Sequence, residues 1–293
     1  MRSLGPVKRY DVRMHRSVIL LTMMAGASGA QDRASWNAPQ EPFKIYGNSY
    51  WVGTHGLGSV LITSPQGHVL IDGALPESAQ QIAAHVRALG FRVEDIKLIL
   101  NSHVHYDHAG GIAQLQKLSG ARVAASEWTA AVLRSGKVAR DDPQYGSIAG
   151  IARVARVETS SDKATLTVGP IAVTEHLTPG HTPGGTSWTW QSCEGARCLN
   201  LVYADSLTPV SSDGFLFSRG NLASEFELSY VFLDSTPCDI LVTPHPDVSN
   251  LWERLAKRST NPDALVDSRA CKDLAARARE QLKQRLAKEQ GQK

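Results

Sequence analysis

Short apolar runs alternate with glycine, proline and polar positions after residue 42. The runs are three to five residues long and rich in Val, Ile, Tyr and Trp, which favours strands, and the gaps between them predict hairpin turns. A longer stretch then places Ile82, Val86 and Leu89 on one helical face before Gly90. The pattern predicts antiparallel strands at 43–46, 50–52, 59–63 and 68–72, followed by a helix at 77–89.

The alternation of strands and helices continues to the end of the chain. Further strands are predicted at 96–100, 122–125, 165–168, 171–176, 187–190, 199–203 and 240–243, and further helices at 111–118, 127–133, 223–234 and 271–288. Two series of strands, each followed by helices, predict two sheets packed together with helices outside. Residues 135–155 show no period, and we interpret this long loop, called the flap below, as a cover for a substrate.

The first thirty residues have the pattern of an export signal. Basic residues precede the apolar run 18–25, and small residues at 28–30 suit a cleavage site. The run is too short to span a membrane. We therefore expect a signal peptide at 1–30, a periplasmic location and a single mature domain at 31–293, with Met14 as an alternative start. Residues 31–42 are interpreted as an arm outside the core.

Removal of that leader changes the charge of the protein. The full chain carries a formal net charge of +3, and the basic residues are concentrated before residue 17, so the mature chain would carry about −1. The basic character belongs to the leader, which argues against nucleic acid as a partner.

Four cysteines in an exported chain predict two disulfides, with three possible pairings. Pairing of nearest neighbours would join Cys193 to Cys198 across a small loop and Cys238 to Cys271 between a late strand and the last helix. No C-x-x-C pair is present, so a zinc finger is a poor interpretation.

The densest cluster of chemically active side chains follows the predicted strand at 96–100. His103 and His105 are two residues apart, so in extended chain they point to the same side. Asp107 and His108 follow where the chain turns toward a helix. Burying these groups without partners would cost several kcal/mol, which favours a metal site over a structural role.

Two further histidines follow predicted strands in loops rich in proline and glycine: His181 within Thr178–Gly185, and His245 within Thr243–Pro246. Taken alone, each could be an ordinary loop residue. Together with the four side chains at 103–108 they give six candidate ligands. One tetrahedral zinc needs fewer than six, so two metal ions are expected.

These motifs resemble the signature of the metallo-β-lactamase superfamily, and the chain resembles its subclass B3 over nearly all of the mature sequence. The resemblance rests on Ile71–Gly73, His103–Gly111, Thr178–Gly185, Trp188–Trp190, Tyr203–Leu207, Pro237–Asp239 and Thr243–Pro246. It implies an α/β fold, the αββα sandwich, with two mixed sheets face to face.

The resemblance also implies a site and an activity. His103, His105 and His181 would hold the first Zn²⁺, and Asp107, His108 and His245 the second. Ser206 and Thr208 would bind the substrate carboxylate, and Gln144 in the flap would contact the substrate. A metal-bound hydroxide oriented by Asp107 would open the β-lactam ring of penicillins, cephalosporins and carbapenems, in an enzyme expected to be a monomer.

Asp205 separates this activity from its alternatives. In thioesterases and lactone hydrolases of the same superfamily, an aspartate at about this strand end bridges both metals, and Asp205 could do so here. The leader and the Ser206 and Thr208 pair favour β-lactams over an exported thioesterase or lactonase. A zinc-binding protein without catalytic activity is a third possibility, disfavoured because all six ligands are present.

Overall fold

The structure is a computed structural model that describes Met1 and residues 33–291. The expected signal peptide lies outside the described residues. The first sheet has seven strands in chain order: β1 (Phe43–Tyr46), β2 (Ser49–Trp51), β3 (Val60–Ile62), β4 (His68–Ile71), β5 (Ile96–Leu100), β6 (Arg122–Ser126) and β7 (Val157–Ser160). The second runs in the order β12 (Ile240–Val242), β11 (Arg197–Tyr203), β10 (Thr186–Glu194), β9 (Ile171–Leu177) and β8 (Thr165–Val168).

Each sheet combines antiparallel and parallel pairs. β1 to β4 are joined as the expected antiparallel hairpins, whereas β4 to β7 pair in parallel. In the second sheet, β8 to β11 are antiparallel and β12 lies parallel to β11. The expectation of two mixed sheets is therefore confirmed.

The alternation of side chains along the strands separates the molecule into layers. On β5, Leu98 and Leu100 pack into the core between the sheets, whereas Ile99 faces the helices outside the first sheet. On β11, Leu201 faces the inner core and Val202 packs under the helices of the second sheet. Because successive strand residues point to opposite faces, one continuous apolar run can serve two cores.

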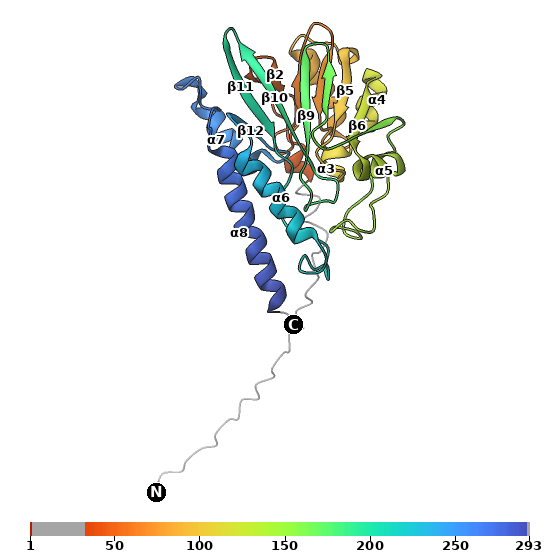
Figure 1. Ribbon diagram of the computed structural model, residues 1–293, viewed down its shortest axis with the longest axis vertical. Coiled ribbons are helices and arrows are strands. Elements are labelled where there is room, and N and C mark those ends of the chain that lie inside the picture. Colours follow the sequence, from red (N-terminus) through yellow and green to blue (C-terminus); the bar gives the residue numbers. More distant parts are fainter. Residues whose placement is uncertain (2–32, 292–293) are drawn as a thin grey trace.

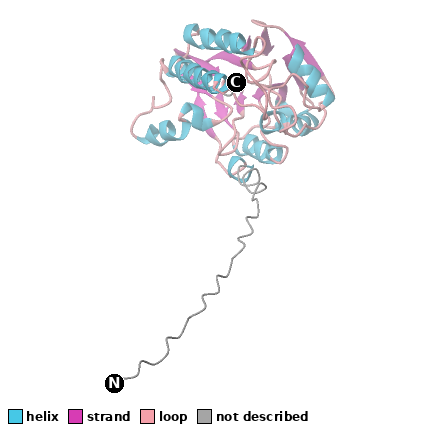
Figure 2. Ribbon diagram, turned by 90° about the horizontal axis from the view of Figure 1, so that it is seen from below, coloured by secondary structure: helices cyan, strands magenta, loops and turns pink. Residues whose placement is uncertain are grey.

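Helices cover the outer faces of both sheets (Figures 1 and 2). α2 (Ser78–Ala88), α4 (Ile112–Ser119) and α5 (Glu127–Ser135) lie on the first sheet, and α6 (Leu222–Ser235) and α8 (Ala270–Gln290) on the second. The remaining elements are short: η1 (Val93–Asp95), α3 (Tyr106–Ala109), η2 (Pro246–Ser249), α7 (Leu251–Ala256) and η3 (Lys257–Ser259). No helix among the described residues has the length and apolar character needed to cross a membrane.

Disulfides tie two regions of the second half. Cys193 pairs with Cys198 across the β10–β11 hairpin, and Cys238 pairs with Cys271 at the start of α8. The nearest-neighbour pairing is confirmed.

Candidate metal centre

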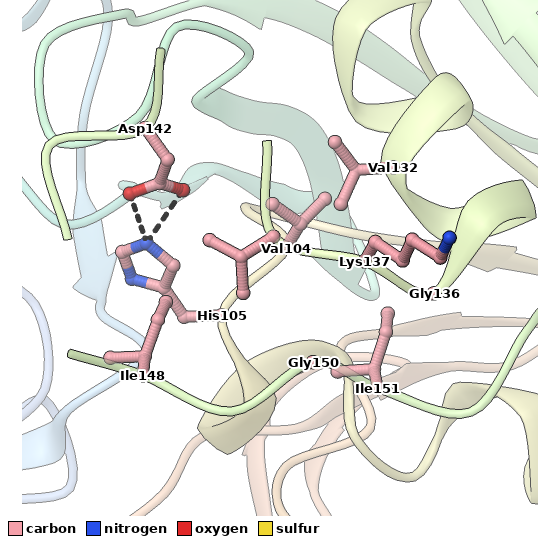
Figure 3. A pocket seen from close by; sticks show the side chains of 10 residues that line it. Val104, His105, Val132, Gly136, Lys137, Asp142, Ile148, Gly150 and Ile151 are labelled. Carbon is pink, nitrogen blue, oxygen red and sulfur yellow. Dashed lines mark hydrogen bonds and ion pairs between the residues drawn. The ribbon is translucent and has the colours of Figure 1, made fainter. Parts of the chain in front are cut away.

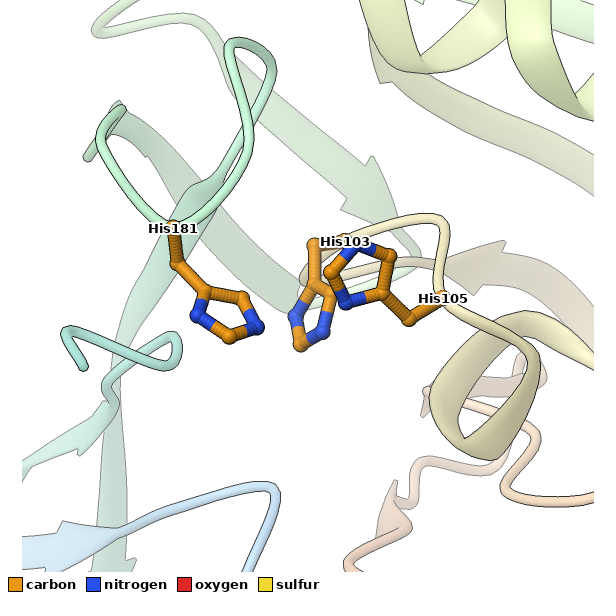
Figure 4. A group of neighbouring side chains, drawn as sticks. All are labelled: His103, His105 and His181. Atoms are coloured by element: carbon orange, nitrogen blue, oxygen red, sulfur yellow. The ribbon is translucent and has the colours of Figure 1, made fainter. Parts of the chain in front are cut away.

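The six candidate ligands come together at one edge of the sandwich, in the loops that follow β5, β9 and β12. His103, His105 and His181 form what we call the first cluster, in which the ring centroids lie 4.7–4.9 Å apart. Figure 4 shows the three rings facing one another, with His181 arriving from the loop after β9. One ligand atom from each ring lies within 4.8 Å of the others. Two distant stretches of sequence therefore converge on the first cluster.

Hydrogen bonds at Nδ1 fix the orientation of two of these rings, His103 and His181. Nδ1 of His103 lies 2.7 Å from Oδ1 of Asp205, and Nδ1 of His181 lies 2.8 Å from the carbonyl oxygen of Thr208. A proton on each Nδ1 leaves the lone pair on Nε2 free to bind a cation. Nε2 of His103 is buried and has no hydrogen-bond partner. An unpaired buried nitrogen at this point fits a site built for a metal ion.

His105 is held through its other nitrogen. Its Nε2 lies 3.1 and 3.2 Å from the two carboxylate oxygens of Asp142 in the flap. Nδ1 is thus directed into the cluster, where the side-chain nitrogen of Gln144 lies 3.4 Å from it. The flap therefore touches both sides of this imidazole.

Asp107, His108 and His245 form the second cluster. Oδ2 of Asp107 lies 3.1 Å from Nε2 of His108 and 3.4 Å from Nε2 of His245. The side chain of His245 is 29% exposed, whereas those of Asp107 and His108 are nearly buried. The ring centroids of His103 and His108 lie only 4.4 Å apart, so the two clusters adjoin.

Burial and neighbouring side chains shift the pKa values of His103, His181 and Asp107. Burial lowers the pKa of His103 well below its ordinary value, and that of His181 to about 3. Burial would raise the pKa of Asp107, but the neighbouring His108 and His245 hold it well below its ordinary value. Neutral imidazoles and an ionised carboxylate are the forms that bind cations.

Asp72 supports the turn that carries the first ligands. Its buried carboxylate accepts hydrogen bonds from the side-chain amide of Asn101, the backbone N–H and hydroxyl of Ser102, and the hydroxyl of Tyr203. The backbone of Asp72 is itself left-handed, with φ 63°. A strained residue that accepts four hydrogen bonds fixes the end of β5 beside the end of β11.

The loop before His181 depends on one glycine. Gly180 has φ 134°, and a Cβ built on it would lie 2.4 Å from the ring of Phe226 in α6. Only glycine fits this backbone so close to an aromatic ring. In the Gly180–His181 pair, the glycine is therefore required by packing against α6, and the histidine is the candidate metal ligand.

The expected substrate residues line the same edge of the sandwich. Gln144 lies beside His105, and Thr208 holds His181 through its carbonyl. Ser206 directly follows Asp205, and its side chain is half-buried. The structure thus brings the side chain of Gln144 and the backbone of Thr208 into contact with the first cluster, and it places Ser206 next to a residue that contacts His103.

Two residues of the centre were missed in the sequence. Asp142 was read only as part of an irregular loop. Trp36, assigned to an arm outside the core, has its ring centroid 5.4 Å from that of His245, so the arm interpretation is wrong at this point. Aspartate before proline in the flap is the one signal that could have marked Asp142 as a turn residue.

Comparisons with known proteins agree with this geometry. A profile of the Metallo-beta-lactamase superfamily matches residues 58–264. The Rm3 metallo-beta-lactamase is 53% identical, with a TM-score of 0.87, over 89% of this chain and 98% of that one. MEM-A1, a subclass B3 metallo-beta-lactamase from a soil metagenome library, is 48% identical with a TM-score of 0.87, over 88% of this chain and 100% of that one.

A curated relative matches over a shorter region. The hydroxyacylglutathione hydrolase of Anaeromyxobacter dehalogenans (strain 2CP-C) is 33% identical over 122 residues, which are 42% of this chain and 37% of that protein. The chain therefore covers little more than a third of the length of this relative.

The chain belongs to the metallo-β-lactamase superfamily. Within it, the similarity to solved subclass B3 structures over nearly their whole length assigns the chain to that subclass. The resemblance seen in the sequence and the αββα fold are confirmed.

Proposed function

We propose that the protein is a zinc-dependent hydrolase that opens the ring of β-lactam antibiotics: penicillins, cephalosporins and carbapenems. The observation that carries the proposal is the pair of adjoining ligand clusters in a chain of subclass B3. Histidine nitrogen and carboxylate oxygen are ligands that zinc prefers, and two adjacent sites suit hydrolysis by two ions.

Each proposed ligand has a defined position. His103, His105 and His181 would hold the first zinc, and Asp107, His108 and His245 the second. When bound, such a pair of ions supplies a Lewis acid for the substrate carbonyl and lowers the pKa of water toward neutrality.

The chain's own groups would act around the substrate. His108 and His245 hold the pKa of Asp107 well below its ordinary value, so its carboxylate can orient the attacking water. Ser206 and Thr208 would donate hydrogen bonds to the substrate carboxylate. Gln144 would contact the substrate from the flap, beside His105.

The remaining expectations concern the whole protein. We propose a signal peptide at 1–30, a single mature domain at 31–293, a periplasmic location and a monomeric state. Two disulfides support an oxidising compartment, because such bonds persist there and are rare in the cytosol.

A thioesterase or lactone hydrolase of the same superfamily is the second candidate. The similarity of part of the chain to a hydroxyacylglutathione hydrolase supports considering this activity. This candidate would need Asp205 as a bridging ligand, yet Oδ1 of Asp205 contacts Nδ1 of His103, on the side of the ring away from Nε2. That contact favours an orienting role for Asp205 and hence the β-lactam proposal.

The test measures three substrates with one preparation. The mature protein is assayed with a carbapenem, a hydroxyacyl thioester and an acylated lactone, each with and without a chelator. We expect turnover of the carbapenem that is abolished by the chelator and by His181→Ala. Turnover of the thioester or lactone without any β-lactam would favour the second candidate, and full carbapenem turnover in chelator would refute the zinc proposal.

A further inference from the structure

Asp142 is a buried carboxylate of the flap that the proposed chemistry does not use. Its residue exposure is 1%, although its neighbour Asp141 lies at the surface. Both oxygens of Asp142 lie within 3.2 Å of Nε2 of His105. A buried carboxylate needs partners to offset its desolvation, and this imidazole N–H is one of them.

The same carboxylate holds the turn of the flap. The backbone N–H of Gln144 donates to Oδ1 of Asp142 at 2.8 Å, and the N–H of Tyr145 donates to the Asp142 carbonyl at 2.9 Å. Pro143 occupies the second position of this turn, where its fixed φ suits the geometry. One side chain therefore bonds to a candidate ligand and to the backbone of Gln144, the expected substrate contact.

Apolar packing shields this contact from water. Figure 3 shows a small cavity beneath the flap, bounded on one side by His105 and Asp142 and elsewhere by Val104, Val132 and Ile151. His105 and Asp142 are both almost fully buried, with 3% and 1% of their surface exposed. Water therefore has little access to compete for the hydrogen bond between them.

We propose that Asp142 is a positioning residue that couples the flap to the first metal site. By holding the N–H of His105, it directs Nδ1 toward the metal, and by bonding to Gln144 it sets the flap turn at the same time. The proposal rests on the zinc function proposed above. It follows that metal binding and flap order depend on each other, because any interaction that favours the held orientation of His105 also favours the closed turn.

Neighbouring contacts provide a matched control. The exposed side chain of Asp141 accepts a hydrogen bond at 2.9 Å from the indole N–H of Trp128 in α5, rather than from His105. Asp141→Ala therefore perturbs the flap one residue away without touching the imidazole. Asp142→Ala removes the coupling contact, and Asp142→Asn keeps a carbonyl oxygen that can accept from His105.

The experiment has two readouts on the full mature chain. First, the apoproteins are titrated with Zn²⁺ against a chromophoric chelator. We expect Asp142→Ala to weaken one of two sites by about 10- to 100-fold, Asp142→Asn to weaken it less, and Asp141→Ala to change it by no more than about two-fold. Second, hydrogen exchange is followed at the amides of Gln144 and Tyr145 with and without Zn²⁺. Protection should rise on zinc binding in the wild type and in Asp141→Ala, but not in Asp142→Ala.

The outcomes separate the two proposals. If the wild type binds two zinc ions and Asp142→Ala binds them with equal affinity and equal gain of flap protection, the coupling proposal is overturned and the zinc function stands. If the wild type itself binds no zinc, both proposals fail. Should Asp142→Ala not fold, Asp142→Leu, which fills the same space without an acceptor, decides the case: wild-type affinity together with wild-type protection would again overturn the coupling.

Discussion

Removal of the carboxylate behind His103 gives the sharpest test of how the first cluster is built. The contact between Nδ1 of His103 and Oδ1 of Asp205 is 2.7 Å long, and both side chains are fully buried. Asp205→Ala would leave the buried N–H of His103 with only the hydroxyl oxygen of Ser102, 3.5 Å away, as an acceptor, and loss of the strong acceptor costs about 1–3 kcal/mol. At about 1.4 kcal/mol per factor of ten, zinc affinity of the first cluster should fall by roughly 5- to 150-fold.

The measurement gives both the number of zinc ions bound per chain and the affinity of each site. Native mass spectrometry at the lowest free zinc concentration that fills both wild-type sites should show one ion retained by Asp205→Ala, and chelator competition should show one weakened site. Asp205→Asn should lose less, because its carbonyl oxygen can still accept from His103. Joint loss of both ions would refute the reasoning, since a bridging ligand affects both metals, and would favour the thioesterase or lactonase candidate.

Three further predictions concern stability and metal dependence. In the loop-entropy account, replacing Cys238 and Cys271 by serine should lower the free energy of unfolding, measured with urea, by about 3–4 kcal/mol. The same change at Cys193 and Cys198 should lower it by about 2 kcal/mol, because the loop that this disulfide closes is much shorter. Equal losses would contradict that account. Burial raises the pKa of Glu175 above its ordinary 4.5, so folding favours its neutral form and stability falls as pH rises through the folded pKa. Glu175→Gln should therefore raise the melting temperature at pH 7, with the difference vanishing below pH 4.5; a constant difference would exclude this cause. Zinc at about a hundred times its dissociation constant should stabilise the apoprotein by about 2.7 kcal/mol, and a melting temperature unchanged by zinc would argue against binding to the folded state.

Strong hydrophobic patterns made most of the fold predictable. The inner strands β4, β5 and β11 serve two cores, so each contains a run of three consecutive apolar residues that stands out in the sequence: Val69–Ile71, Leu98–Leu100 and Leu201–Tyr203. β7 was missed because it is an edge strand in which only Val157 is buried. The strand expected at 187–190 extends over Thr186–Glu194, because its far half lies in a hairpin and carries polar residues.

The candidate centre was predictable where ligands are close in sequence or carry a motif. His103, His105, Asp107 and His108 fall within six residues, which no structural role explains easily. Asp142 lies 37 residues from His105, in a loop with no periodic signal, and only the fold brings the two together. Groups that orient ligands are ordinary aspartates in sequence, so their role depends on tertiary structure.

The central claim is that two cations occupy the adjoining clusters, and X-ray diffraction at wavelengths on either side of the zinc absorption edge tests it most directly. We predict two anomalous peaks per chain, one among the nitrogens of His103, His105 and His181 and one among the side chains of Asp107, His108 and His245. Crystals grown with zinc that show no peak between these side chains would contradict the account.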